Sequence, residues 1–279
     1  METRSRIRPA RYAPRSATTA AALFEDAVAR LTSEAVELTG DEPRDVAEHE
    51  EAADRVVDLL AVRAWQSFQH RSHGDAQEVA KRCVAYVVAA DTGRSEALQF
   101  APTARDVRTG RRELHRLTGE ALLLLTLPEH FDAATDRVRA LLGTAPEGRL
   151  AAAWRTADEA LRTLGATRHQ WVGADPGVVA AAGWVLVDRV GRLLLSAALA
   201  AQAAQVAQAV QAARVAQLAQ AVQASAGTRP DAEPLVDAAR RYTWNHLRGP
   251  APEAVASAHM ACSRQLVAAL APLRRGEPR

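Results

Sequence analysis

The chain has 279 residues, enough for one large domain or two small ones. Its 35 basic and 33 acidic residues leave a formal net charge of +2, which gives no reason to expect a nucleic-acid partner. Ala is the commonest residue and nearly all basic residues are Arg, a composition that points to the codon usage of a high-GC bacterium.

Helix-forming patterns run along the whole chain, and strand patterns are almost absent. Apolar residues repeat at spacings of three and four, and Gly or Pro residues separate these repeats. We therefore predict an all-α fold, a helical bundle of about eight helices joined by short loops. In chain order, helices are expected over about residues 18–39, 41–73, 75–93, 103–127, 128–143, 146–165, 175–225, 232–248 and 252–271.

The predicted helices fall into two regions that follow a basic arm. Residues 1–17 are Arg-rich, contain Pro9 and Pro14, and are expected to form a disordered arm. Residues 18–172 are expected to form an N-terminal helical bundle. Residues 173–279 are expected to form a C-terminal helical region, either as a separate unit or as one continuous domain with the first region.

The apolar repeats also predict which side chains face the core. In each helix these residues recur every three or four positions, so they lie on one face. The predicted core residues include Phe24, Val28, Leu31, Val46, Ala53, Val56, Leu60, Trp65, Phe68, Val79, Cys83, Val87, Phe131, Val138, Leu142, Leu150, Trp154, Ala157, Leu161 and Leu164.

The most apolar segment, residues 177–201, is expected to be a buried helix and not a membrane span. Asp188, Arg189 and Arg192 lie at its middle, and each would cost about 2.5–3.5 kcal/mol at the centre of a bilayer. The N-terminus lacks the apolar run of a secretory signal. Cys83 and Cys262 lie far apart in apolar helical patterns, which suggests a reducing compartment. We therefore expect a cytoplasmic protein.

A long Ala/Gln-rich helix is expected over about residues 175–225, with a long polar side chain at every third position from 202 to 223. On a helix each step of three residues turns 300°, so this polar stripe winds around the axis and leaves no fixed polar face. The bulky aliphatic residues must therefore determine which sides of the helix pack against other helices. We predict that they contact a partner helix; they are Leu199, Val206, Val210, Val215, Leu218 and Val222.

The length of this helix leaves two alternatives open. An unbroken helix over residues 176–225 would span about 75 Å, whereas a compact chain of this size has a diameter of about 50 Å. Either the helix breaks, at Gly183 or Gly191, or it projects from the body. A projecting Ala/Gln helix would favour close pairing with another subunit.

Sequence motifs for catalysis are absent. The chain has no Walker loop, no G-x-G-x-x-G, no G-x-S-x-G, no H-E-x-x-H and no C-x-x-C. We therefore predict no catalytic residues, no cofactor and no metal site. His70 and His73, three residues apart before Asp75, are interpreted as structural residues at a helix C-terminus.

Two charged clusters offer alternatives. Glu50, Glu51, Asp54 and Asp58 could hold Mg²⁺ for a diphosphate substrate, but no second acidic cluster completes such a site. A solvated helix face with a Glu51–Arg55 pair is favoured. The second cluster is a basic stripe that could track phosphates, although no aromatic residue lies between the arginines to stack on bases. It consists of Arg105, Arg108, Arg112 and Arg116.

The sequence thus favours a non-enzymatic helical interaction or assembly protein that self-associates or binds a helical protein partner. The alternative is a nucleic-acid-associated protein that uses the stripe from Arg105 to Arg116 together with the N-terminal arm. A more remote alternative is a Mg²⁺-dependent all-α enzyme that uses Glu50, Glu51 and Asp54.

Overall fold

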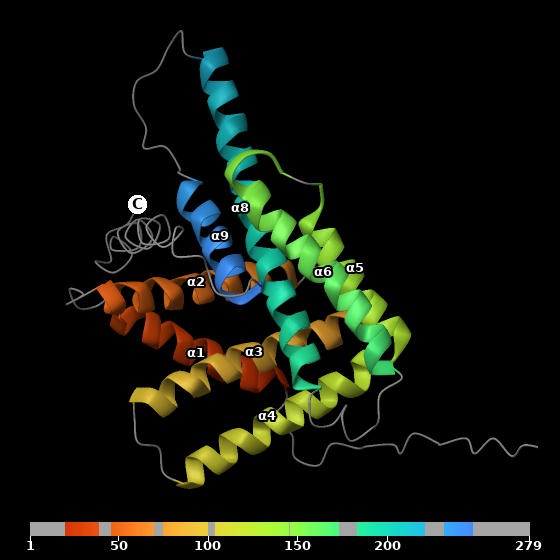
Figure 1. Cartoon of the computed structure of the whole chain (residues 1–279). Coiled ribbons are helices and arrows are strands. Elements are labelled where there is room, and N and C mark those ends of the chain that lie inside the picture. The colour runs from red at the N-terminus through yellow and green to blue at the C-terminus, as the bar shows by residue number, and fades with distance from the viewer. Residues whose placement is uncertain are drawn as a thin grey trace, which may run out of the picture.

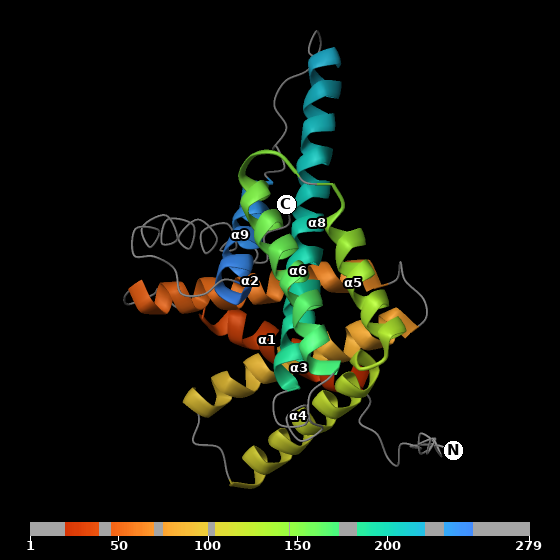
Figure 2. The same ribbon diagram turned by 45° about the vertical axis from the view of Figure 1, so that its right-hand side comes forward.

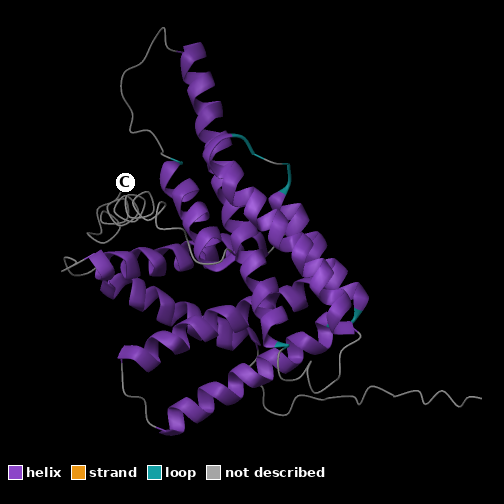
Figure 3. Cartoon of the chain, in the orientation of Figure 1, coloured by secondary structure: helices purple, strands orange, loops and turns teal. Residues whose placement is uncertain are grey.

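The computed structural model describes residues 20–38, 46–69, 75–99, 104–144, 146–172, 183–220 and 232–247. Within these ranges the chain forms eight α-helices, one short 3-10 helix and no strand, which confirms the predicted all-α fold (Figure 3). The helices are α1 (Ala20–Leu38), α2 (Val46–Gln69), α3 (Asp75–Gln99), α4 (Ala104–Leu125), α5 (Pro128–Leu142), α6 (Ala151–Val172), α8 (Trp184–Gln220) and α9 (Glu233–Leu247), and the 3-10 helix η1 (Gly148–Leu150) precedes α6.

Several predicted helix ends differ from the observed ones. α3 continues through Gly93 to Gln99, and α6 continues through Gly165 to Val172. A single Gly costs a helix only about 1 kcal/mol relative to Ala, so packing along the rest of each helix outweighs it. The predicted arm at 1–17, the residues 70–74 and the last predicted helix at 252–271 lie outside the described residues.

The long helix α8 is the centre of the bundle. It packs against α2, α3, α4, α5, α6 and α9. Figures 1 and 2 show α5, α6 and α9 running alongside α8, whereas α1, α2, α3 and α4 cross it near its N-terminal end. The helices of the two predicted regions, before and after residue 172, therefore pack against each other through α8.

One hydrophobic core runs through the described residues from α1 to α9. Most predicted core residues of the first, second, third, fifth and sixth helices are buried in it, and Leu60 and Trp154 are partly buried against it. The prediction for Val46 is wrong, because this first residue of α2 is 51 % exposed. The apolar repeats otherwise identified the inner faces correctly. The two predicted regions, before and after the boundary at residues 172/173, share this core. Leu193, Leu199 and Tyr242 of the C-terminal region belong to the same cluster as the core residues of the N-terminal region.

α8 is unbroken over its 37 residues, which correspond to a length of about 55 Å. It begins one residue after Gly183 and passes through Gly191 without interruption, so the alternative of a break at Gly191 is wrong. Its C-terminal end extends beyond the start of α9 and the connection between α5 and α6 (Figures 1 and 2). The residues at 208, 209, 211 and 212 are exposed there.

By length and composition alone, the segment Trp184–Ala212 of α8 could cross a bilayer, and it is the one such segment among the described residues. Half of it is buried inside the bundle. It also contains Arg192, a buried charge that pairs with Asp91 of α3. Both observations are typical of the central helix of a folded core.

At Gly191, α8 packs directly against the backbone of α3. A Cβ atom at this position would lie 2.6 Å from the carbonyl oxygen of Cys83 and 2.5 Å from Cγ2 of Val87. Both distances are too short for any side chain, and one of them is to backbone. The two helices can therefore pack this closely only if residue 191 is Gly.

We expect Gly191→Ala to lower the free energy of unfolding by about 1–3 kcal/mol, because the new methyl group must push α8 away from the α3 backbone. Gly119→Ala is the matched control, since a Cβ at that helical position meets no atom within 4 Å. It should stabilise the protein by up to about 1 kcal/mol through helix propensity. Urea unfolding followed by circular dichroism measures both, and equal effects would contradict this account.

Candidate functional site

Four helices bring charged and polar side chains together on one side of α8. We call this group the polar centre. Each member is less than one-fifth exposed, although ionisable groups are rarely buried unless they are paired. Its members are Asp58 of α2, Asp91 of α3, Asp188 and Arg192 of α8, and Tyr242 and His246 of α9.

Arg192 is the hub of the polar centre. Its Nη2 lies 2.8 Å from Oδ1 of Asp91 and its Nη1 lies 3.1 Å from Oδ2, so the pair is bidentate. Its Nε donates to Asp188, one helical turn earlier, at 3.1 Å. Burial alone would lower the pKa of Arg192, but the charge of Asp91 raises it above its ordinary value. The guanidinium therefore stays charged inside the bundle.

The position of Arg192 follows from the close approach at Gly191. Cys83, Val87 and Asp91 are spaced four residues apart and lie on one face of α3. Gly191 packs against the first two of these residues, so the next residue of α8 lies close to the third. The close packing that requires Gly at 191 thus places the charged side chain of Arg192 next to Asp91.

His246 connects Arg192 to Asp58. Its Nδ1 lies 2.7 Å from Nη1 of Arg192, and its Nε2 lies 2.9 Å from Oδ1 of Asp58. A guanidinium can only donate, so Nδ1 must accept and the hydrogen of the neutral ring must lie on Nε2, where it donates to Asp58. The hydrogen-bond network thereby assigns the tautomer and links α8, α9 and α2.

Tyr242 lies one turn before His246, and the two rings contact each other with centroids 4.4 Å apart. The side chain is 1 % exposed, and its hydroxyl has no hydrogen-bond partner among the described residues. Burial raises the pKa of Tyr242 well above its ordinary value, although Arg192 acts in the opposite direction. The hydroxyl therefore remains protonated and can donate a hydrogen bond.

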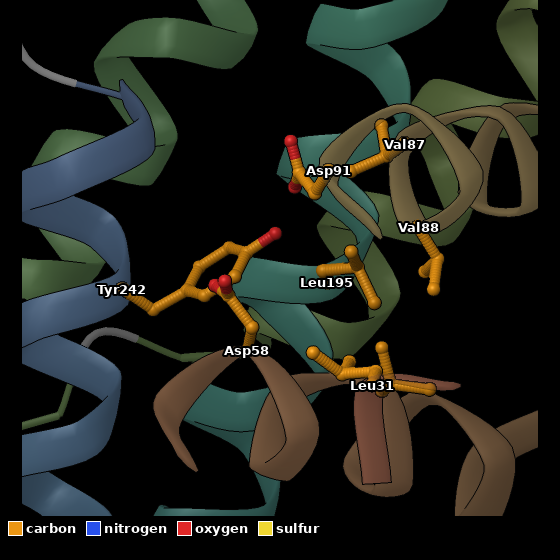
Figure 4. A pocket seen from close by; sticks show the side chains of 8 residues that line it. Leu31, Asp58, Val87, Val88, Asp91, Leu195 and Tyr242 are labelled. Atoms are coloured by element: carbon orange, nitrogen blue, oxygen red, sulfur yellow. The ribbon is translucent and has the colours of Figure 1, made fainter. Parts of the chain in front are cut away.

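A small pocket lies in front of this hydroxyl. Figure 4 shows the Tyr242 side chain reaching into the space near Asp58 and Asp91, which belong to the pocket wall. The remaining wall is aliphatic and includes Leu31, Val88 and Leu195. The space is large enough for the centre of about one water molecule.

A second polar contact, the α2–α9 seam, joins Glu50 and Asp54 of α2 to Arg241 and Asn245 of α9. The fully buried Arg241 side chain donates to Oε2 of Glu50 at 2.5 Å and to Oδ1 of Asp54 at 2.6 Å. Asn245 donates to the same oxygen of Asp54 at 2.6 Å. The seam and the polar centre lie next to each other along α9, and together they fasten α9 to α2.

The α2–α9 seam corrects our interpretation of the acidic cluster as a solvated helix face. Glu50 and Asp54 bind a buried Arg241 from a distant part of the chain, whereas Glu51 is exposed. The Asp54 side chain is 44 % exposed on its other side. Arg55 lies near Glu34 at 3.6 Å and Asp58 at 3.8 Å instead of pairing with Glu51. Because their carboxylates bind Arg241, Glu50 and Asp54 give no support to a Mg²⁺ site. The described residues contain no group of three His, Cys, Asp or Glu side chains suited to a metal.

The predicted basic stripe lies on α4, which is helical through Gly110. Arg116 pairs with Glu120 on the same helix at 3.0 Å, so part of its charge is balanced. The side chains of the other three members, Arg105, Arg108 and Arg112, lie outside the described residues.

The predicted partner-contact residues of α8 fall into three groups. Leu199 is fully buried in the core of its own chain, so we exclude it from contact with a second chain. Val206 and Val210 are half-buried near the edge of the body. Val215 and Leu218 lie on the helical backbone of the projecting end, but their side chains are not described. Val222 lies beyond the described part of α8.

Comparison with known proteins found no protein family, no curated protein and no solved structure that matches this chain. Any inference about function therefore rests on two features of the structure. They are the projecting end of α8 and the polar centre with its small pocket.

We expect Asp91→Ala to lower the free energy of unfolding by about 3 kcal/mol, because it removes the bidentate partner of the buried Arg192. Asp136→Ala is the control, since its pair with Arg139 lies on the surface and should contribute about 1 kcal/mol or less. Urea unfolding of the two variants measures the difference. A loss for Asp91→Ala no larger than that of the control would show that Arg192 does not depend on this pair.

Proposed function

We propose that this chain is a non-enzymatic assembly protein that forms dimers through the projecting end of α8. We call residues 205–220 the α8 extension. The observation that supports this function is that the extension leaves the body as an unbroken helix with exposed side chains at 208, 209, 211 and 212. A second helix could therefore lie along it without displacing any other described helix.

The composition of the α8 extension supports contact with protein and not exposure to water. Arg214 is its single charged residue in sixteen positions, and the rest are Ala, Gln, Val and Leu. A helix face in solvent is usually rich in charged residues, whereas the centres of protein interfaces are depleted in them. Ala also allows two helix axes to approach closely, so that small side chains can interdigitate.

A second copy of the chain is the partner that this surface fits best. Each copy presents the same helix surface of Ala, Gln and Val residues, and a two-fold axis would place the two surfaces against each other. An antiparallel arrangement opposes the two helix dipoles, so it is favoured over a parallel one. The extension is about 24 Å long, which is short for a standard interface, so we expect micromolar affinity.

The test is the oligomeric state in solution. Wild-type protein should change from monomer to dimer between about 1 and 100 micromolar in light-scattering and sedimentation measurements. A double variant, Val210→Glu with Val215→Glu, should stay monomeric, because four charges would have to be buried in the dimer. Circular dichroism should show that the variant keeps its helicity.

Val36→Glu is the matched control, because Val36 is 58 % exposed on α1, away from the α8 extension. This control should dimerise like the wild type. A wild-type protein that remains a helical monomer over the whole concentration range would overturn the proposal. Dimerisation that survives the double variant would place the interface elsewhere.

A further inference from the structure

The Tyr242 hydroxyl is an exception to the otherwise complete pairing of the polar centre. It is buried and protonated, and it points into the small pocket near Asp58 and Asp91 (Figure 4). Folded proteins rarely leave a buried hydroxyl without a partner, because its bond to water is lost on folding. The partner must be a group small enough for this pocket.

The two carboxylates of the pocket can still accept hydrogen bonds. Asp58 receives one from His246, and Asp91 receives two from Arg192. Each carboxylate oxygen can accept two hydrogen bonds, so acceptor positions remain on both residues. The pocket thus combines one donor, two acceptors and room for one small molecule.

We propose that this pocket is the binding site of a single structural water molecule. The water accepts the hydrogen bond of the Tyr242 hydroxyl and donates its two hydrogens to Asp58 and Asp91. Three hydrogen bonds are the usual number for a buried water in a protein.

Water fits the pocket better than a cation does. The pocket wall offers three residues with oxygen atoms, and both carboxylates already bind positively charged or N–H groups. Mg²⁺ and Ca²⁺ take six or more oxygen ligands, and the aliphatic remainder of the wall supplies none. A cation would also need to bring further water molecules, for which the pocket has no room.

The bound water closes a ring of hydrogen bonds. Starting from the water, the ring runs to Asp58, then through His246 and Arg192 to Asp91, and back to the water. Tyr242 adds a third bond from α9. The water therefore acts as a ligand that holds α2, α3 and α9 together around α8.

A crystal structure at about 1.5 Å resolution tests the site directly. We expect one spherical density peak about 2.7–2.8 Å from the Tyr242 hydroxyl and from one oxygen of each carboxylate, the distance of an O–H···O hydrogen bond. A peak at the shorter distances of a metal–oxygen bond, about 2.0–2.6 Å, would mean a cation and would overturn the proposal. So would a pocket closed by a direct bond from Tyr242 to an aspartate.

A substitution provides a second test, because only a hydroxyl with a bound partner stabilises the protein. If the hydroxyl binds a water, Tyr242→Phe should lower the midpoint of thermal unfolding by about 2–4 °C, the effect of one lost hydrogen bond. If the hydroxyl had no partner, its removal would leave the midpoint unchanged or raise it, and that result would overturn the proposal.

Ser196→Ala is the reference variant, because it shows how far the loss of one buried hydroxyl hydrogen bond lowers the midpoint of thermal unfolding. The Ser196 hydroxyl is also buried between α8 and α9, but it bonds directly to the Thr243 hydroxyl at 2.9 Å. Its loss should lower the midpoint by a similar amount. In the crystal structure of Ser196→Ala the water should persist, whereas in that of Tyr242→Phe it should be lost or weakly occupied.

Discussion

The contact of Gly191 with the backbone of α3 is the constraint on which the rest of the described structure depends. Without a side chain at 191, α8 packs directly on Cys83 and Val87, and its next residue reaches Asp91. The Cys83 side chain is itself fully buried, and burial raises the pKa of its thiol, so the thiol stays protonated. The missing side chain at 191 therefore determines both the spacing of the two helices and the ion pair that forms between them.

The polar centre reinforces this alignment of the helices. A shift of α8 by one turn would already be opposed by sterics, because a residue with a side chain would replace Gly191 at the contact with the α3 backbone. Such a shift would also separate Arg192 from Asp91 and leave both charges buried without partners, at a high cost. We therefore regard Gly191, the polar centre and the α2–α9 seam as the elements that specify the arrangement, while the apolar core supplies most of the stability.

The sequence predicted the local features of this fold and missed the distant ones. Helix positions and inner faces, such as Phe24, Leu31 and Trp65, follow from spacings of three and four residues. In the sequence, Asp188 and Arg192 indicate only that this segment is unsuited to span a membrane. Their partners Asp91 and His246 lie 101 and 54 residues from Arg192, and no periodic pattern relates such positions. For the same reason the sequence does not predict that Arg241 binds Glu50 and Asp54, and it favours a solvated face for both.

The three-residue repeat in the α8 extension has a consequence for the evolution of this chain. Addition or loss of one repeat unit would change the length of the helix by about 4.5 Å and rotate its tip by about 60°, while the core around Arg192 would stay as it is. In the dimer that we propose, slippage in repetitive DNA would alter the distance and relative orientation of the two bodies in small, regular steps. The folded body would change little, because Ala203, at the start of the repeat, is the last buried residue among the described side chains of α8.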